Sequence, residues 1–176
     1  MAISVKLRLL SVSVVIVCFL ALSTLAAAAD RFKKMDAQGK ELPADAPVWA
    51  IIFDTTSELY WEVKTADKSS HAKDAVYTYT NVKDDFVAKI NAENFGGHTD
   101  WRLPATDELA GLKKRKKNSP EALIDLQYFP ETQPGRYMSV GWCGSKSEYQ
   151  EESIKFGKQK VKGAKYVRAV RGKPLE

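Results

Sequence analysis

Hydrophobic and polar positions change their period along the chain, and the first change indicates two strands. Residues 48–53 are continuously apolar, whereas Leu59, Trp61 and Val63 alternate with polar positions. Successive side chains of a strand point to opposite faces, so both runs are typical of strands. Residues 54–57 between them are Asp, Thr and Ser, which favour turns. The pattern therefore predicts a β-hairpin.

Helical spacing replaces this alternation after residue 80. The apolar positions Val82, Phe86, Val87 and Ile90 fall on one helical face, with Asn81 as the expected N-cap and Gly96 near the end. A second helix is expected after Pro104, running to residues 118–120. Residues 113–117 would then form its last turns, where cations oppose the helix dipole.

Strand-like runs return in the C-terminal part, at residues 137–142, 154–156 and 166–170. Residues 30–47 are polar and show no apolar period, which indicates a lead-in before the fold. The order is a hairpin, two helices, irregular loops and then strands. This order predicts a single α+β domain in which the last strand returns beside the first.

The first 29 residues have the features of an export signal. Lys6 and Arg8 precede an apolar stretch at residues 9–22, and small residues at 26–29 precede Asp30. We expect cleavage there, no membrane insertion afterwards, and a periplasmic, secreted or cell-surface location. Cleavage would remove Cys18 and leave Cys143 as the remaining thiol, so no intramolecular disulfide is expected. Cys143 could pair between chains, but a small buried residue is the favoured interpretation.

Composition excludes several classes of protein but does not indicate a particular function. The chain of 176 residues has 27 Lys and Arg against 22 Asp and Glu, and 28% charged residues. These values are typical of a mildly basic globular domain and not of a disordered, collagenous or coiled-coil chain.

One short motif is more distinctive than the rest. It consists of Asp100, Trp101, Arg102, Leu103 and Pro104, followed by Glu108. Trp101 and Leu103 can point into a core, while Asp100 is expected to pair with Arg102 or with nearby backbone. Pro104 sets the entry to the helix. The motif is expected to form an architectural corner.

This motif, with the hairpin at residues 54–62, Asn91, residues 95–97 and 128–130, and the closing run at 166–171, resembles the family named for the C-terminal domain of the Legionella collagen-like protein (Lcl). The resemblance covers residues 48–172 and leaves a tail at 173–176. It implies a C-type-lectin-like fold and a secreted or surface module, with some members implicated in binding sulfated glycosaminoglycans. Ala105 departs from the Thr that is frequent in the family, and Ala169 stands where Cys is frequent.

Catalysis and metal binding find thin support in the sequence. Cys143 with His98 or His71 would be a nucleophile and a base, but only the residue types suggest that pairing. Two histidines and one thiol have no zinc-site spacing, and no calcium-lectin loop is present. We therefore expect no enzyme activity, no metal and no cofactor.

Positive charge is the remaining candidate chemistry. A polyanion site is expected at Lys113, Lys114, Arg115, Lys116, Lys117, Lys158, Lys160 and Lys162. Such clusters attract sulfated polymers, although a solvated helix end and a protected strand edge explain the same residues. Tyr128 and Tyr137 are possible rim residues for stacking on sugars. The hypothesis is an adhesion module that binds an acidic polysaccharide and no nucleic acid. The alternative is a protein-interaction subunit of an envelope assembly, and oligomers are possible in either case.

Overall fold

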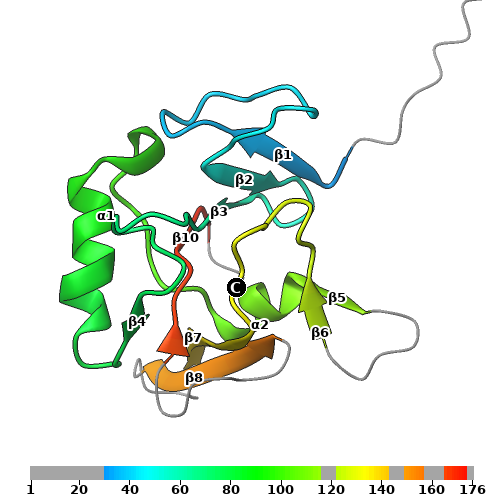
Figure 1. Ribbon diagram of the computed structural model, residues 1–176. Coiled ribbons are helices and arrows are strands. Elements are labelled where there is room, and N and C mark those ends of the chain that lie inside the picture. Colours follow the sequence, from blue (N-terminus) through cyan, green and yellow to red (C-terminus); the bar gives the residue numbers. More distant parts are fainter. Residues whose placement is uncertain (1–29, 116–121, 143–148, 157–164, 174–176) are drawn as a thin grey trace, which may run out of the picture.

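The computed structural model describes residues 30–115, 122–142, 149–156 and 165–173, which fold around two four-stranded sheets (Figure 1). The first sheet has the strand order β1-β2-β3-β10. Its strands are β1 (Phe32–Met35), β2 (Ile51–Asp54), β3 (Leu59–Glu62) and β10 (Val170–Arg171), and every neighbouring pair is antiparallel. The predicted hairpin is confirmed as β2 and β3, with Ile51 opposite Glu62 and Asp54 opposite Leu59.

The second sheet has the order β4-β9-β7-β8, built from β4 (Val76–Tyr77), β9 (Lys165–Tyr166), β7 (Gly135–Trp142) and β8 (Tyr149–Phe156). β7 is antiparallel to β8 and parallel to β9. A separate two-stranded ribbon joins β5 (Lys113–Arg115) to β6 (Ala122–Ile124).

The described residues contain four short helical segments, all between β4 and β5: the π-helix η1 (Lys83–Val87), α1 (Ala88–Ala92), the 3-10 helix η2 (Phe95–Gly97) and α2 (Thr106–Gly111). The continuous helix formed by η1 and α1 lies along one side of the molecule, beside the short strand β4 (Figure 1). Across the residues that the structure describes, no helix has the length and apolar character needed to cross a membrane.

The core explains why the apolar runs of the sequence are continuous. Ile51 packs in one buried cluster with Phe86 and Trp101, whereas its neighbour Ile52 packs in another with Trp61 and Tyr137. Adjacent residues of a strand point to opposite faces, so both faces of the first sheet are covered. The α+β class predicted from the sequence is confirmed.

Residues 30–47 are not the polar lead-in that their composition indicated. Phe32–Met35 forms the edge strand β1, and the Arg31 guanidinium binds both carboxylate oxygens of Asp54, at 3.0 and 2.6 Å. The following turn docks on η2: a Cβ on Gly39 would lie 2.5 Å from the carbonyl oxygen of Gly96. The pattern failed here because an edge strand with a single buried position shows no clear alternation.

The second helix is shorter than predicted, and this changes the setting of the basic run. α2 ends at Gly111, and Lys113–Arg115 continues as strand β5, with Lys113 opposite Ile124 and Arg115 opposite Ala122. The prediction that these cations occupy the last turns of a helix is wrong. Cross-strand pairing with β6, which is not visible in local spacing, overrides a moderate helix propensity.

Two further expectations need correction. The last strand returns to the hairpin, but β10 pairs with β3, and β1 lies at the opposite edge of the sheet. Asn81 does not cap the first helix, because its side-chain oxygen accepts hydrogen bonds from Thr78.

Candidate functional site

The sequence motif at residues 100–108 forms a corner that is held by its own hydrogen bonds. The Trp101 side chain is buried, and its indole N–H donates to the carbonyl of Phe95 at 2.8 Å. The Asn91 amide bonds both the N–H and the C=O of Trp101, at 2.8 and 2.9 Å. Backbone groups buried without partners are costly, so these contacts stabilise the turn between α1 and α2.

Arg102 fixes the start of α2. Its guanidinium binds both carboxylate oxygens of Glu108, each at 2.7 Å, and Glu108 also accepts the N–H of Ala105. Ala105 is the N-cap residue and has no side-chain cap, so only the Glu108 half of a capping box is present. Thr106 does not replace it, since its hydroxyl lies 3.1 Å from that of Ser139.

Arg102 or nearby backbone was expected as the partner of Asp100, but the Asp100 carboxylate pairs with Arg171. The Arg171 Nε donates to Asp100 at 2.8 Å, and this contact lowers the pKa of that carboxyl. The backbones of Arg102 and Val170 exchange two hydrogen bonds of 2.9 Å. The motif therefore closes β10 onto the helical corner.

A buried charge cluster lies where β3 meets the C-terminal segment. Its members are Glu62, Lys64, His71 and Arg168. Lys64 is 3% exposed and Arg168 is 1% exposed. Glu62 accepts hydrogen bonds from Lys64 at 2.8 Å and from the backbone N–H of Ala169 at 2.8 Å. His71 Nδ1 lies 2.9 Å from Glu62, and Arg168 donates to the carbonyl of Glu62.

The Glu62 carboxylate is stabilised in its charged form. Burial by itself raises its pKa, but the charge of Lys64 and the hydrogen bond from His71 together outweigh burial and lower the pKa to about 2. Burial lowers the pKa of Lys64, against the opposing charge of Glu62. Lys64, His71 and the backbone N–H of Ala169 converge on the Glu62 carboxylate, which ties β3 to the segment before β10.

The positions of the two histidines bear on the catalytic alternative, in which His71 or His98 acts as a base for Cys143. Cys143 lies outside the described residues. His71 is bound to Glu62 on one side, and its Nε2 lies 3.2 Å from Glu93 on the other, while His98 stacks near Tyr60. Within the described ranges, no three His, Cys, Asp or Glu side chains are grouped to hold a metal ion.

The predicted basic run is divided by the structure. Lys113 and Lys114 are exposed on β5, and the Lys114 ammonium pairs with Asp125 at 2.7 Å. Arg115 occupies the end of the same strand. Lys116, Lys117, Lys158, Lys160 and Lys162 lie outside the described residues.

A second group of cations, which the sequence analysis missed, lies on the second sheet. Arg136 on β7 is directly opposite Lys155 on β8, so both side chains point to one face. Tyr137 pairs with Tyr166 across the parallel strands, and this register brings Lys165 of β9 beside Arg136. We call Arg136, Lys155 and Lys165 the sheet cations.

Electrostatics support this arrangement. Burial, and then the positive charge of Arg136, lower the pKa of Lys165, as like charges in proximity do. Alternation within the predicted strand at residues 154–156 could have placed Lys155 on an outward face, whereas Arg136 directly precedes the predicted strand at residues 137–142. No feature of the sequence indicates the strand register that brings Arg136, Lys155 and Lys165 together.

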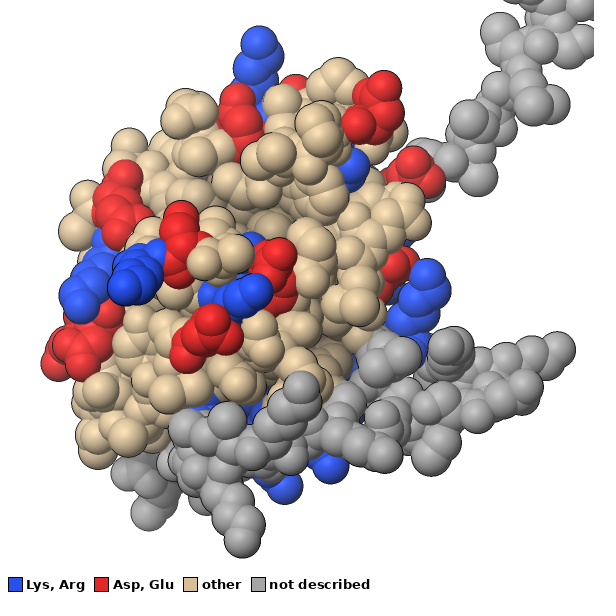
Figure 2. All heavy atoms as spheres, in the orientation of Figure 1, with Lys and Arg blue, Asp and Glu red and all other residues tan. Residues whose placement is uncertain are grey.

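Figure 2 shows one face of the molecule, on which basic and acidic side chains are interspersed. The coloured residues in this view do not form a continuous basic surface.

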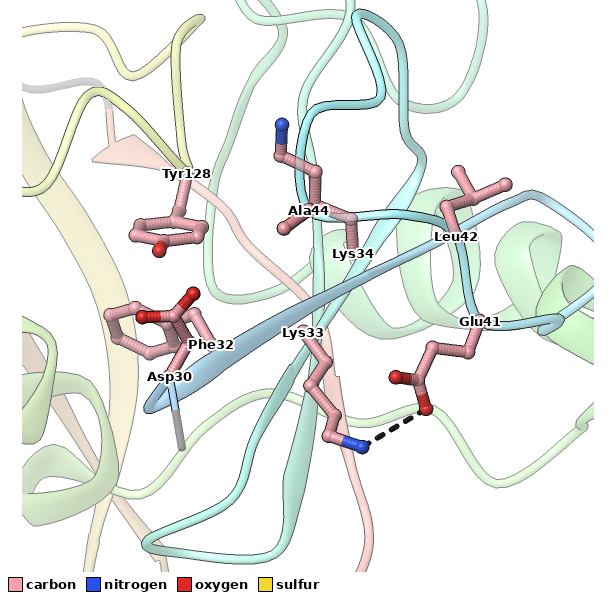
Figure 3. A pocket seen from close by; sticks show the side chains of 8 residues that line it. All are labelled: Asp30, Phe32, Lys33, Lys34, Glu41, Leu42, Ala44 and Tyr128. Carbon is pink, nitrogen blue, oxygen red and sulfur yellow. Dashed lines mark hydrogen bonds and ion pairs between the residues drawn. The ribbon is translucent and has the colours of Figure 1, made fainter. Parts of the chain in front are cut away.

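Aromatic rim residues were predicted at Tyr128 and Tyr137. Tyr137 is a core residue, 1% exposed, and the prediction for it is wrong because its ring packs in a buried cluster with Trp61 and Phe156. Tyr128 is partly exposed and lines a pocket of about 200 Å³ (Figure 3). The other lining residues are Asp30, Phe32, Lys33, Lys34, Glu41, Leu42 and Ala44.

Comparison with known families gives one match. The sequence model of the Lcl C-terminal domain family matches residues 50–171, which include the corner, the buried charge cluster and the sheet cations. The family is associated with secreted or surface proteins, and the match indicates a module of the extracellular or adhesion type. Neither the curated proteins nor the solved structures gave a match.

Proposed function

Because the chain belongs to the Lcl C-terminal domain family, we propose that it is an exported, non-enzymatic binding module that captures acidic, sulfated glycans at the cell envelope or outside the cell. The proposal includes a C-type-lectin-like ancestry for its α+β fold. It replaces the expected helix end with the sheet cations as the principal contact surface. Lys113 and Lys114 on β5 are secondary contacts.

The observation that carries the proposal is the juxtaposition of Arg136, Lys155 and Lys165 on three neighbouring strands. Strands in a sheet are about 4.8 Å apart, so the three charges are held close together by the backbone. Like charges directly opposite each other destabilise a sheet. A bound polyanion would relieve that repulsion and release counter-ions, which gives affinity without a deep pocket.

The sequence adds a reason to place the surface here. The segment between β8 and β9 contains Lys158, Lys160 and Lys162, and its two ends adjoin Lys155 and Lys165. A cationic segment joined to a cationic strand end increases the local charge density. Linear polyanions respond to charge density more than to detailed shape.

The test is binding of the purified protein to heparin across a salt series from about 50 to 200 mM. In the triple variant Arg136→Ser/Lys155→Ser/Lys165→Ser, affinity should fall by about tenfold or more at the lowest salt. The slope of log affinity against log salt should become shallower by up to about three, near one for each lost contact.

A matched control removes three cations elsewhere, in the variant Lys33→Ser/Lys83→Ser/Lys89→Ser, and should change affinity much less. The pair Lys113→Ser/Lys114→Ser tests the secondary contacts. Equal losses in the triple variant and the control would show attraction by net charge alone and would contradict a defined site. No binding of the unaltered protein at low salt would favour the protein-interaction alternative.

A further inference from the structure

The N-terminal segment builds a pocket that the family match does not cover. Seven of its eight lining residues lie between positions 30 and 44, before the matched region begins at residue 50. Tyr128 alone comes from the matched domain, from the loop after β6. The pocket is therefore a feature of this chain that membership of the family does not explain.

One wall of the pocket is aromatic. The rings of Phe32 and Tyr128 have centroids 5.0 Å apart and are inclined by 55° to each other. The indole N–H of Trp49 donates to the carbonyl of Tyr128 at 2.9 Å, which holds the loop that carries this ring. Phe32 also packs edge-on against the buried ring of Phe129. The aromatic wall is thus supported from behind by the core.

The opposite side of the pocket is polar at its rim. Lys33 binds Glu41 at 3.1 Å across the turn that follows β1, and this pair lies away from the aromatic wall in Figure 3. Asp30 lies on the aromatic side, beside Phe32 and Tyr128 in Figure 3, and its charge contributes, after burial, to raising the pKa of the Tyr128 phenol. Two carboxylates that accept and an ammonium that donates therefore line the pocket together with the apolar residues Phe32, Leu42 and Ala44.

The side-chain charges of the pocket balance. Two lysines and two carboxylates line it, and the Lys34 ammonium is directed to the carbonyl of Ala46, over the Trp49 ring. An acidic ligand would meet Asp30 and Glu41, and a cationic ligand would meet Lys33. The arrangement suits a ligand with no net charge, one apolar face and several hydroxyl groups.

From these features we infer that the pocket binds a single neutral pyranose unit, with its C–H face against Tyr128 and its hydroxyl groups at the Asp30, Lys33 and Glu41 rim. Pockets for drug-sized ligands measure roughly 300–1,000 Å³, so a pocket of about 200 Å³ fits one sugar ring better than a larger ligand. This inference does not rest on the polyanion site, which lies on the second sheet.

Saturation-transfer NMR on the purified protein tests the inference. The probes are methyl β-glucopyranoside, methyl β-galactopyranoside and N-acetylglucosamine, each at millimolar concentration. At least one should receive saturation mainly on the C–H protons of one ring face, and should shift the indole N–H resonance of Trp49. Tyr128→Ala should weaken binding by about tenfold, whereas Tyr128→Phe should retain most of it.

Further variants keep the result interpretable. Ala44→Phe fills the pocket without removing a contact and should also abolish binding. The control Tyr79→Ala alters a tyrosine of the other core cluster, and the triple variant of the sheet cations alters the polyanion site; both should leave sugar binding unchanged.

Three results would overturn the inference. The first is no saturation transfer to any of the three sugars. The second is equally strong binding of cyclohexanol, which would indicate an apolar cavity without sugar recognition. The third is binding of glucuronate as strong as that of the neutral glucoside, which would contradict the charge argument. Loss of heparin binding in the triple variant, with sugar binding retained, would separate the two sites.

Discussion

The buried charge cluster and the sheet cations use charge in opposite ways. Around Glu62, donors from Lys64, His71 and the backbone of Ala169 neutralise one carboxylate inside the fold. On the second sheet, Arg136 lies directly opposite Lys155, and like charges remain adjacent. The first arrangement pairs opposite charges, whereas the second gathers like charges on neighbouring strands. Opposite charges paired in the interior serve the fold, and like charges gathered on the surface attract a polyanion.

The most severe way to break this comparison is Glu62→Gln. The substitution leaves the Lys64 ammonium buried without its counter-charge, and should lower the free energy of unfolding by about 3–5 kcal/mol. Chemical denaturation monitored by tryptophan fluorescence measures the loss. The control Glu93→Gln alters the exposed partner of His71 and should cost less than about 1 kcal/mol. If both variants lose the same stability, the buried cluster does not have the role assigned to it.

Lowering the pH should reveal the contribution of the buried charge cluster to stability without any mutation. The pKa of Glu62 is about 2 in the folded protein against an ordinary value of 4.5, so the unfolded chain takes up a proton first. The stability contributed by this carboxylate is complete above about pH 4.5 and is lost as the pH falls toward 2. Denaturation curves between neutral pH and pH 2 measure it. In Glu62→Gln, this part of the pH dependence should disappear.

A cap without charge provides a smaller and independent reference. Ala105→Thr supplies the missing side-chain acceptor at the N-cap of α2, and should raise the free energy of unfolding by about 0.5–1 kcal/mol. Ala110→Thr, within the same helix, should give no increase, because a β-branched residue is slightly unfavourable there. A melting temperature that is unchanged or lower in Ala105→Thr would reject the cap assignment.

The variant with the smallest expected change in stability tests the like-charge pair of Arg136 and Lys155 directly. Lys155→Glu places a carboxylate opposite Arg136 and should stabilise the sheet by roughly 0.2–1 kcal/mol. The same variant should bind heparin more weakly, so stability and binding would change in opposite directions. Lys89→Glu makes the same change of charge on α1 and should affect neither property as much. A decrease in both stability and binding for Lys155→Glu would show that Lys155 has a structural role.

The sequence predicted elements wherever a local period was strong. The alternation at Leu59 and Trp61 gave the hairpin, and the spacing of Phe86 and Ile90 gave the first helix, because both patterns follow from backbone geometry alone. The corner around Trp101 was also predictable as architecture. Its specific ion pairs were not, since Asp100 pairs with Arg171, which is 71 positions away in the chain.

The candidate sites were predicted less well, for a related reason. Residues 113–117 form the clearest basic run in the sequence. Strand pairing, however, places Lys114 beside Asp125, whose carboxylate offsets the positive charge of Lys114. The pocket was missed because its residues lie in a segment that looks like a polar tether. This segment forms strand β1 by pairing with β2, and it lines the pocket together with Tyr128. The local sequence pattern indicates neither contact.

By itself, the sequence determined the α+β class, the hairpin, the position of the first helix and the family signature, all of which depend on neighbours in the chain. The tertiary structure decided which distant charges meet: Asp100 with Arg171, and Arg136 with Lys155 and Lys165 on the surface. It also turned a polar segment into one side of a pocket. Local periodicity fixes which face a side chain occupies, whereas strand register fixes its neighbours, and register is set by packing over the whole fold.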